Sequence, residues 1–136
     1  MSNPEPLPAR QPASSTEDGP FWQAAAEDRL VLPKCTSCGT FIWYPRGFCP
    51  KCHTSQVEWV EASGQGTVYS FTVGRRGIGE WAARSPFVIA YVELDEGPRV
   101  LTNIVGVDPD QVRIGARVSA VFEPAGELKV LRFMPV

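Results

Sequence analysis

The 136-residue sequence has little of what most enzymes use for catalysis. It contains one histidine, His53, and neither a Walker phosphate loop nor the G-x-S-x-G motif of serine hydrolases. A single histidine leaves few Ser-His or Cys-His pairs for nucleophilic chemistry. We therefore expect no self-sufficient active site in this chain.

Excess positive charge and long apolar runs are also missing. Thirteen lysines and arginines face 15 acidic residues, for a net charge of −2, so no overall field would draw the chain to nucleic-acid phosphates. No apolar run approaches the roughly 20 residues that span a bilayer. The first five residues have neither a basic start nor a hydrophobic signal core. We expect a cytoplasmic protein.

Cysteine is confined to two C-x-x-C pairs that are separated by ten residues: Cys35, Cys38, Cys49 and Cys52. In a reducing compartment such a cluster holds metal more readily than it forms disulfides. Two pairs at this spacing predict two knuckles around one tetrahedral zinc ion, with a closed, structural coordination shell. Gly39 and His53 follow the pairs at positions that require a positive φ, which glycine and histidine tolerate.

Other interpretations of the cysteines remain open at this point. Cys49 to His53 matches the C-x-x-C-H pattern of c-type haem attachment, and a single C-x-x-C also serves redox chemistry, normally beside a βαβ unit. Iron competes with zinc for four thiolates, as in rubredoxin. His53 is a candidate fifth ligand or general base, or else a solvated residue of the second knuckle.

The composition divides the chain into four segments. Residues 1–19 are rich in proline and polar residues and predict a disordered tail. A short helix over residues 20–31 is expected to begin after Asp18, which can cap it, and to carry the apolar pair Phe21 and Trp22. That pair is expected to pack on the chain's own barrel or to dock on a partner. Residues 32–62 form the zinc ribbon, and residues 63–136 form the barrel.

The barrel is predicted from five β-strand segments. In the first, Tyr69, Phe71 and Val73 alternate with polar residues, which indicates one buried face; the second is apolar on both faces. A helical turn is expected at residues 108–112, after the third strand. The fold class is therefore mainly β, with a five-stranded OB-fold, although an SH3-like barrel would show similar strands. The segments are Gly66–Gly74, Pro86–Leu94, Arg99–Val107, Ala116–Glu123 and Leu128–Met134.

Two further segments carry candidate binding residues. The long connection between the first two strands contains Arg75, Arg76 and Trp81, which could clamp a phosphate and stack on an adenine, or anchor a protein interface. A solvated loop with one packed tryptophan is the alternative. Between the knuckles lie several large apolar residues that the rest of the chain or a subunit interface must cover: Phe41, Ile42, Trp43, Tyr44 and Phe48.

The order of these features resembles a family of acyl-CoA-associated proteins with an N-terminal helix, a rubredoxin-like zinc ribbon and an OB-fold. The resemblance covers residues 20–134 and includes the strand segment at residues 66–73. It implies a non-catalytic accessory subunit of a thiolase-like enzyme, namely a thiolase, aldolase or acyltransferase, in lipid, steroid or polyketide-type acyl-CoA metabolism. The partner would supply the catalytic residues, and acyl-CoA would bind at the shared interface. The four cysteines transfer directly as metal ligands.

Two other functions are kept as alternatives. Zinc ribbons and OB-folds both occur in single-stranded nucleic-acid-binding modules, although these usually combine aromatic residues with a basic groove. An independent acyl-CoA hydrolase or transferase would need a nucleophile and a base that one histidine and four liganded cysteines do not supply.

Overall fold

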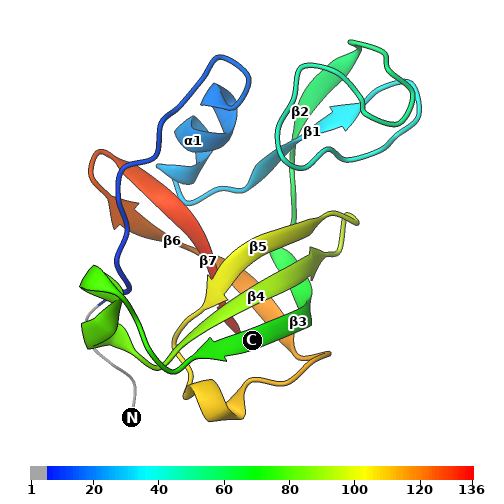
Figure 1. Cartoon of the computed structure of the whole chain (residues 1–136). Coiled ribbons are helices and arrows are strands. Elements are labelled where there is room, and N and C mark those ends of the chain that lie inside the picture. The colour runs from blue at the N-terminus through cyan, green and yellow to red at the C-terminus, as the bar shows by residue number, and fades with distance from the viewer. Residues whose placement is uncertain (1–5) are drawn as a thin grey trace.

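The computed structural model describes residues 6–136, which form a small two-stranded unit above a β-barrel (Figure 1). None of the helices in this range is long and apolar enough to cross a membrane. The elements, in chain order, are α1 (Gly19–Ala25), β1 (Val31–Cys35), β2 (Val57–Glu61), β3 (Gln65–Gly74), the 3-10 helix η1 (Gly79–Arg84), β4 (Phe87–Leu94), β5 (Arg99–Ile104), the 3-10 turn η2 (Pro109–Gln111), β6 (Arg117–Ala125) and β7 (Leu128–Pro135).

The five strands β3 to β7 close into a barrel with the neighbour order β3-β4-β5-β7-β6. All neighbours are antiparallel except β5 and β7, which run parallel and pair only at Ile104 and Phe133. This is the Greek-key arrangement of an OB-fold, with a helical turn, η2, between its third and fourth strands. The predicted fold class is confirmed, and each expected barrel strand is present within a few residues of its predicted bounds.

The first barrel strand contains a β-bulge that the sequence pattern did not reveal. Val68 pairs with Val92 and Ser70 pairs with Tyr91, so Tyr69 is the extra residue. The bulge turns Tyr69 outward, where it is 47% exposed and the Arg99 guanidinium lies 3.8 Å from its ring centroid. The expectation that Tyr69 lies on a buried face is wrong, and Val68 occupies the core in its place.

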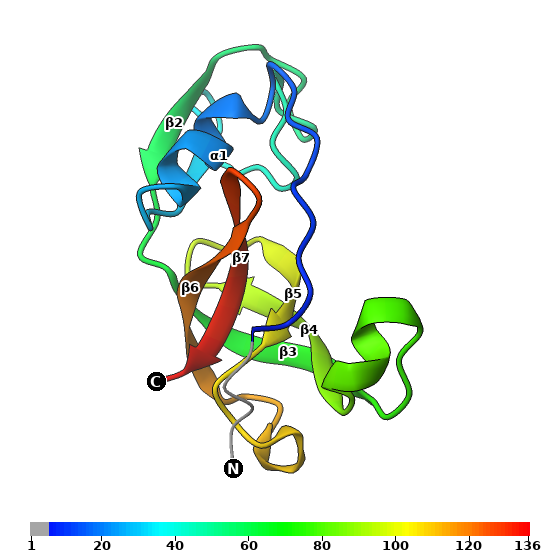
Figure 2. The same cartoon turned by 90° about the vertical axis from the view of Figure 1, so that its left-hand side faces the viewer.

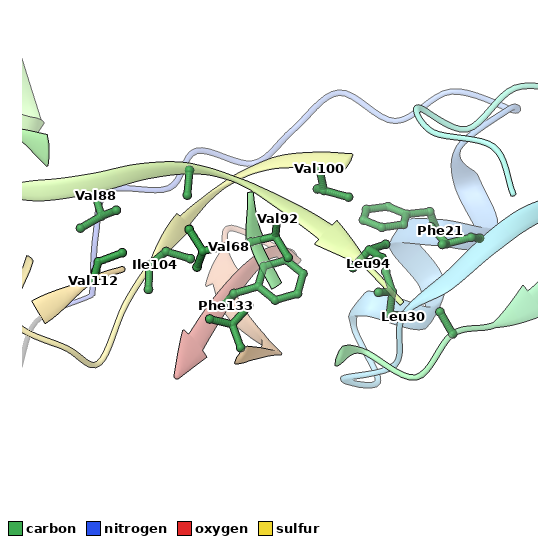
Figure 3. Packing of buried hydrophobic residues seen from close by; sticks show 14 of the residues in the cluster. Phe21, Leu30, Val68, Val88, Val92, Leu94, Val100, Ile104, Val112 and Phe133 are labelled. Carbon is green, nitrogen blue, oxygen red and sulfur yellow. The ribbon is translucent and has the colours of Figure 1, made fainter. Parts of the chain in front are cut away.

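The core continues from the barrel into the helix (Figure 3). Alternate residues of β4 and β5 point inward around Phe133, and Phe21 of α1 and Leu30 belong to the same buried cluster. The helix therefore closes one end of the barrel. The buried residues labelled in the figure are Phe21, Leu30, Val68, Val88, Val92, Leu94, Val100, Ile104, Val112 and Phe133.

Helix α1 is shorter than predicted and has no side-chain cap. It ends at Ala25, and Asp18 occupies the position before its first residue without bonding to the helix amides. Instead the Asp18 carboxylate accepts hydrogen bonds from the Ser15 amide (2.6 Å) and the Tyr44 hydroxyl (2.9 Å). The expectation of a capping Asp18 is thus wrong, because donors in the ribbon and in the preceding turn occupy its carboxylate oxygens.

The N-terminal segment differs from the expected disordered tail. Residues 1–5 lie outside the described part of the chain, but residues 6–18 follow a defined path down the side of the barrel (Figure 2). The Arg132 guanidinium on β7 donates hydrogen bonds to the carbonyl oxygens of Leu7 and Pro8. Tertiary hydrogen bonds to a buried cation therefore order a segment whose composition alone indicates disorder.

Asp18 is a buried carboxylate that joins three parts of the chain, and its removal is expected to destabilise the fold. Burial alone would raise the pKa of Asp18, but the hydrogen bonds from Ser15 and Tyr44 outweigh it and the pKa is lowered. Asp18→Asn should reduce the free energy of unfolding by about 1–3 kcal/mol at neutral pH. Ser14→Ala, which removes only the longer 3.3 Å bond, is the matched control.

The pH dependence follows from the lowered pKa of Asp18. Its stabilising contribution is present above the unfolded-state pKa, near 3.8, and is lost as the pH falls through the folded-state pKa. The stability gap between the wild-type chain and Asp18→Asn should therefore narrow from about pH 6 to about pH 3. Burial and the Asp18 hydrogen bond raise the pKa of Tyr44 to about 12, so the same variant should also lower that pKa in a spectrophotometric titration. If the stability difference does not change with pH and the Tyr44 pKa is the same in Asp18→Asn, the role assigned to Asp18 is wrong.

Candidate metal centre and exposed apolar face

The two C-x-x-C segments form matching knuckles at the end of the β1–β2 sheet. In the first, the Cys35 amide donates to Thr40 and the Gly39 amide donates to the Cys35 carbonyl; in the second, Cys49, Thr54 and His53 repeat these bonds at 2.8 Å. Gly39 has a φ of 76° and His53 a φ of 65°, as the sequence predicted. The left-handed residue turns each chain back, so both cysteines of a pair face the same point.

The four sulfur atoms gather in one cluster and all lie within 4.8 Å of one another. The Sγ atoms of Cys35 and Cys52 are 3.5 Å apart, and those of Cys38 and Cys49 are 3.6 Å apart. A tetrahedral ion with metal–sulfur bonds of about 2.3 Å needs sulfur separations of about 3.8 Å. A disulfide would need about 2.05 Å. The cluster therefore matches a four-thiolate metal site, and the cysteines are free thiols.

Repulsion between the cysteine thiolates also favours a cation at this centre. Hydrogen bonds with Thr40 lower the pKa of Cys38 to about 6. The Thr54 amide favours the Cys52 thiolate, yet the neighbouring sulfurs raise the pKa of Cys52 to about 11. Several thiolates at this spacing repel one another unless a metal ion neutralises them.

His53 does not complete this site as a fifth ligand. Among the described residues, the group whose ligand atoms converge contains only the four cysteines. His53 is exposed and contributes its backbone to the second knuckle. Its role is the solvated knuckle residue.

The aromatic pair of α1 is not a docking site. Phe21 is 2% exposed and Trp22 is 9% exposed, and their rings meet edge to face with centroids 4.8 Å apart. Both belong to the core cluster shared with the barrel. Of the two expected placements, the structure shows packing on the chain's own barrel, where these large apolar side chains close the barrel end.

Of the apolar residues between the knuckles, some are covered by the rest of the chain and others remain exposed. Ile42 is buried within the ribbon, and Phe41 and Trp43 pack against the main core. Tyr44 and Phe48 are 43% and 44% exposed. The chain itself therefore covers most of this apolar set.

The loop between β3 and β4 brings Arg76 and Trp81 together and separates them from Arg75. The Arg75 guanidinium reaches away to Asp110 of η2 at 2.8 Å. Arg76 is exposed and forms no ion pair with any residue in the range 6–136, and it shares a shallow hollow with Trp81. The Trp81 ring lies against Phe87, with centroids 4.7 Å apart. Arg76 and Trp81 therefore belong to one surface, and Arg75 supports the loop.

This hollow continues onto the outer face of strands β4 and β5, which is apolar and exposed. Ile89 is 38% exposed, Tyr91 45% and Leu101 59%. The hollow measures about 500 Å³ and is lined by Arg76, Gly77, Ile78, Trp81, Phe87, Ile89, Leu101, Thr102 and Asn103. The β4–β5 face, as we call it, consists of the exposed residues Ile78, Ile89, Tyr91 and Leu101, the partly exposed rings of Trp81 and Phe87, and Arg76. In the sequence, this face is indicated by the second strand segment, Pro86–Leu94, which is apolar on both faces.

Fold and site together define a class of protein: a four-cysteine ribbon joined to an OB-fold whose outer face is apolar. Residues 22–58 match the family model described as ChsH2, rubredoxin-like zinc ribbon domain, and residues 59–123 match ChsH2, C-terminal OB-fold domain. The chain belongs to this ChsH2 family, whose relatives are also named DUF35 proteins.

Relatives of known name span several roles. A DUF35 domain-containing scaffold protein of Methanothermobacter thermautotrophicus is 38% identical over 99 residues, 72% of this chain and 74% of the relative. A probable enoyl-CoA hydratase alpha subunit of Thermomonospora curvata is 39% identical over 84% of this chain, which spans only 36% of that relative's length. The benzoylsuccinyl-CoA thiolase subunit BbsA of Geobacter metallireducens is 30% identical over 67% of this chain and 60% of the relative.

The structure has a counterpart among solved proteins. A chain of the Ltp2-ChsH2(DUF35) aldolase superposes with a TM-score of 0.81 at 37% identity, covering 92% of this chain and 98% of that one. The ribbon, the helix and the barrel are thus shared in their relative placement.

Loss of one sulfur should release the metal and disorder the ribbon. Cys38→Ser replaces an exposed ligand with an isosteric hydroxyl, which is a poor substitute for a thiolate. We expect the purified variant to lose its metal by elemental analysis and the amide signals of β1 and β2 to lose dispersion by NMR. Signals from β3 to β7 should persist, because most of the main buried cluster comes from these strands. Ser37→Ala is the control, and full metal content in Cys38→Ser would refute the assignment.

Proposed function

We propose that this chain is a non-catalytic accessory subunit that binds a thiolase-like enzyme and helps form its acyl-CoA site. The observation that carries the proposal is the β4–β5 face, an exposed apolar surface on a protein of net charge −2. Contiguous apolar surface of this kind, rimmed by polar residues, is typical of protein interfaces. The partner would be a thiolase, an aldolase or an acyltransferase in lipid, steroid or polyketide-type metabolism.

The absence of a catalytic constellation supports a subunit without its own chemistry. The only histidine is exposed beside the metal centre, and all four cysteines belong to that centre. A four-thiolate shell leaves no open position for a catalytic water. Catalytic groups would then belong to the partner.

The names of the relatives support both the partner and its substrate class. One is named as a thiolase subunit, others are named as scaffold proteins, and the superposed structure is named as an aldolase that contains Ltp2 and ChsH2(DUF35). Four of the relatives' names include a CoA thioester. We assign acyl-CoA to the shared interface, where the Arg76 guanidinium, which has no ion-pair partner among residues 6–136, and the Trp81 ring suit a phosphate and an aromatic base.

We further propose that the metal is one structural zinc ion held by Cys35, Cys38, Cys49 and Cys52. The family description as a zinc ribbon supports this choice. Zinc has no redox chemistry of its own, and four thiolates in a closed shell suit it well. The free thiols that the site requires also suit a reducing cytoplasm.

A single-stranded nucleic-acid-binding module is less well supported. OB-folds that bind oligonucleotides use the face of their second and third strands, here β4 and β5. Such sites combine a positive groove with stacking aromatic residues. Among the nine described residues that line the hollow, Arg76 is the one cation and five have apolar side chains. The chemistry of the surface favours a protein partner.

The proposal is tested by co-expression with thiolase-like proteins from the same host, followed by gentle purification through a tag on this chain. We expect one of them to co-elute in a fixed ratio and to gain acyl-CoA turnover compared with the partner alone. Recovery of the chain without such a protein, or saturable and salt-sensitive binding of single-stranded DNA, would overturn the proposal.

Charge placed on the β4–β5 face should disrupt the complex. In Leu101→Asp the exposed leucine at the centre of the face becomes a carboxylate, which the partner must bury. Because a buried unpaired charge is costly, we expect affinity for the partner to fall at least about tenfold in a calorimetric titration. Ile114→Asp is the matched control, since Ile114 is 69% exposed and lies outside the hollow. Equal effects of the two substitutions would exclude this face as the docking surface.

A further inference from the structure

The N-terminal residues 6–12, which we call the strap, connect two loops at opposite ends of the barrel (Figure 2). At one end the Arg84 guanidinium donates to the Pro6 carbonyl at 3.2 Å, and Arg10 pairs with Glu80 at 3.2 Å. At the other end the Glu127 amide, in the β6–β7 turn, donates to the Gln11 side chain at 2.9 Å. The strap therefore contacts η1, whose residues border the β4–β5 face.

A buried arginine holds the middle of the strap. The Arg132 side chain is 6% exposed, and its guanidinium contacts the Glu123 carboxylate at 2.5 Å. Its remaining donors reach the Leu7 carbonyl at 3.1 Å and the Pro8 carbonyl at 2.7 Å. A buried guanidinium needs such acceptors, because unsatisfied donors in the interior are costly. The strap thus completes the hydrogen bonding of Arg132, and Arg132 fixes the strap.

Arg132 lies next to the weakest seam of the barrel. Strands β5 and β7 share one residue pair, Ile104 and Phe133, whereas β6 and β7 share eight. The Thr102 hydroxyl on β5 donates to the Leu131 carbonyl on β7 beside it. The strap is therefore attached where the barrel has few backbone hydrogen bonds of its own.

The β3–β4 connection, residues 75–86, which we call the docking loop, is otherwise held by the Arg75–Asp110 ion pair and by the packing of Trp81 on Phe87. Helix η1 contains no buried residue, and the Trp81 ring packs against Phe87. Segments with few buried apolar contacts open at low free energy. Contacts with the strap at Glu80 and Arg84 therefore form a substantial part of what fixes this loop.

From these contacts we infer that the strap positions the docking loop, with Arg132 as the positioning residue that acts through it. This inference rests on the proposed function, because the loop borders the surface assigned to the partner. Because the loop is already ordered before binding, less conformational entropy is lost when the partner binds. A chain with a released strap would bind its partner more weakly although every residue of the β4–β5 face is intact.

The test is a double variant, Arg132→Leu with Glu123→Leu, in the full-length chain. Replacing both members of a buried ion pair leaves no unpaired charge, so the barrel should stay folded. Backbone order parameters from 15N relaxation should fall from about 0.85 to below about 0.6 in the strap and in residues 79–84. Affinity for the thiolase-like partner should fall about tenfold, a typical coupling between sites.

Two further variants separate positioning from general stability. Arg132→Lys keeps the charge opposite Glu123 but loses the planar fork that serves three acceptors, so it should release the strap in part. Arg117→Gln with Asp95→Asn removes an exposed ion pair of the barrel, 2.7 Å long, that touches neither strap nor loop. This control should leave loop order and affinity unchanged.

Each outcome of the experiment has a distinct meaning. A loop that stays rigid in the double variant overturns the inference, whether or not the partner binds. A loop that loosens while partner affinity is unchanged also overturns it. If the wild-type chain binds no thiolase-like partner at all, the proposed function fails, whereas the relaxation measurement still decides whether the strap orders the loop.

Discussion

The cysteine-bearing end of the ribbon depends on one constraint, which is that its own hydrophobic cluster is very small. Its own buried cluster consists of Cys35, Ile42 and Cys49, with Val57 packed beside them. A two-stranded sheet is marginal by itself in water. Metal–thiolate bonds supply roughly 10 to 16 kcal/mol in comparable peptides and replace the missing core. The positive φ at Gly39 and His53 turns the chain so that the sulfur atoms of each pair point toward the metal position.

Two buried charges then attach the N-terminal segment to the rest of the chain. Asp18 accepts hydrogen bonds from the preceding turn and from Tyr44 of the ribbon, and Arg132 donates to two carbonyls of the strap. Burying a charge is unfavourable unless its hydrogen bonds are satisfied in one particular arrangement. Charges of this kind specify where a polar segment lies, which apolar contacts alone specify poorly because they lack direction.

The division of apolar residues explains why this small barrel can serve as a binding module. Phe21 and Trp22 close the end of the barrel, so they are unavailable to a partner. The outer side of β4 and β5 remains uncovered and apolar, and Arg76 and Trp81 border it. OB-folds bind their ligands on this same pair of strands, and the side chains present there decide the class of ligand.

The sequence by itself determined the local features whose cause is local. The spacing of the cysteines and the residues after each pair predicted the metal site, and turn residues and β-branched runs predicted five barrel strands. Tertiary structure alone decided the rest. The bulge at Tyr69 reverses the facing of a strand, because one extra residue changes the side on which alternate residues lie. Residues 6–18 are held by hydrogen bonds to distant parts of the chain, among them those that Arg132 donates to the carbonyls of Leu7 and Pro8, more than 120 residues away. Such long-range hydrogen bonds leave no periodic trace in the sequence, so only the folded chain reveals them.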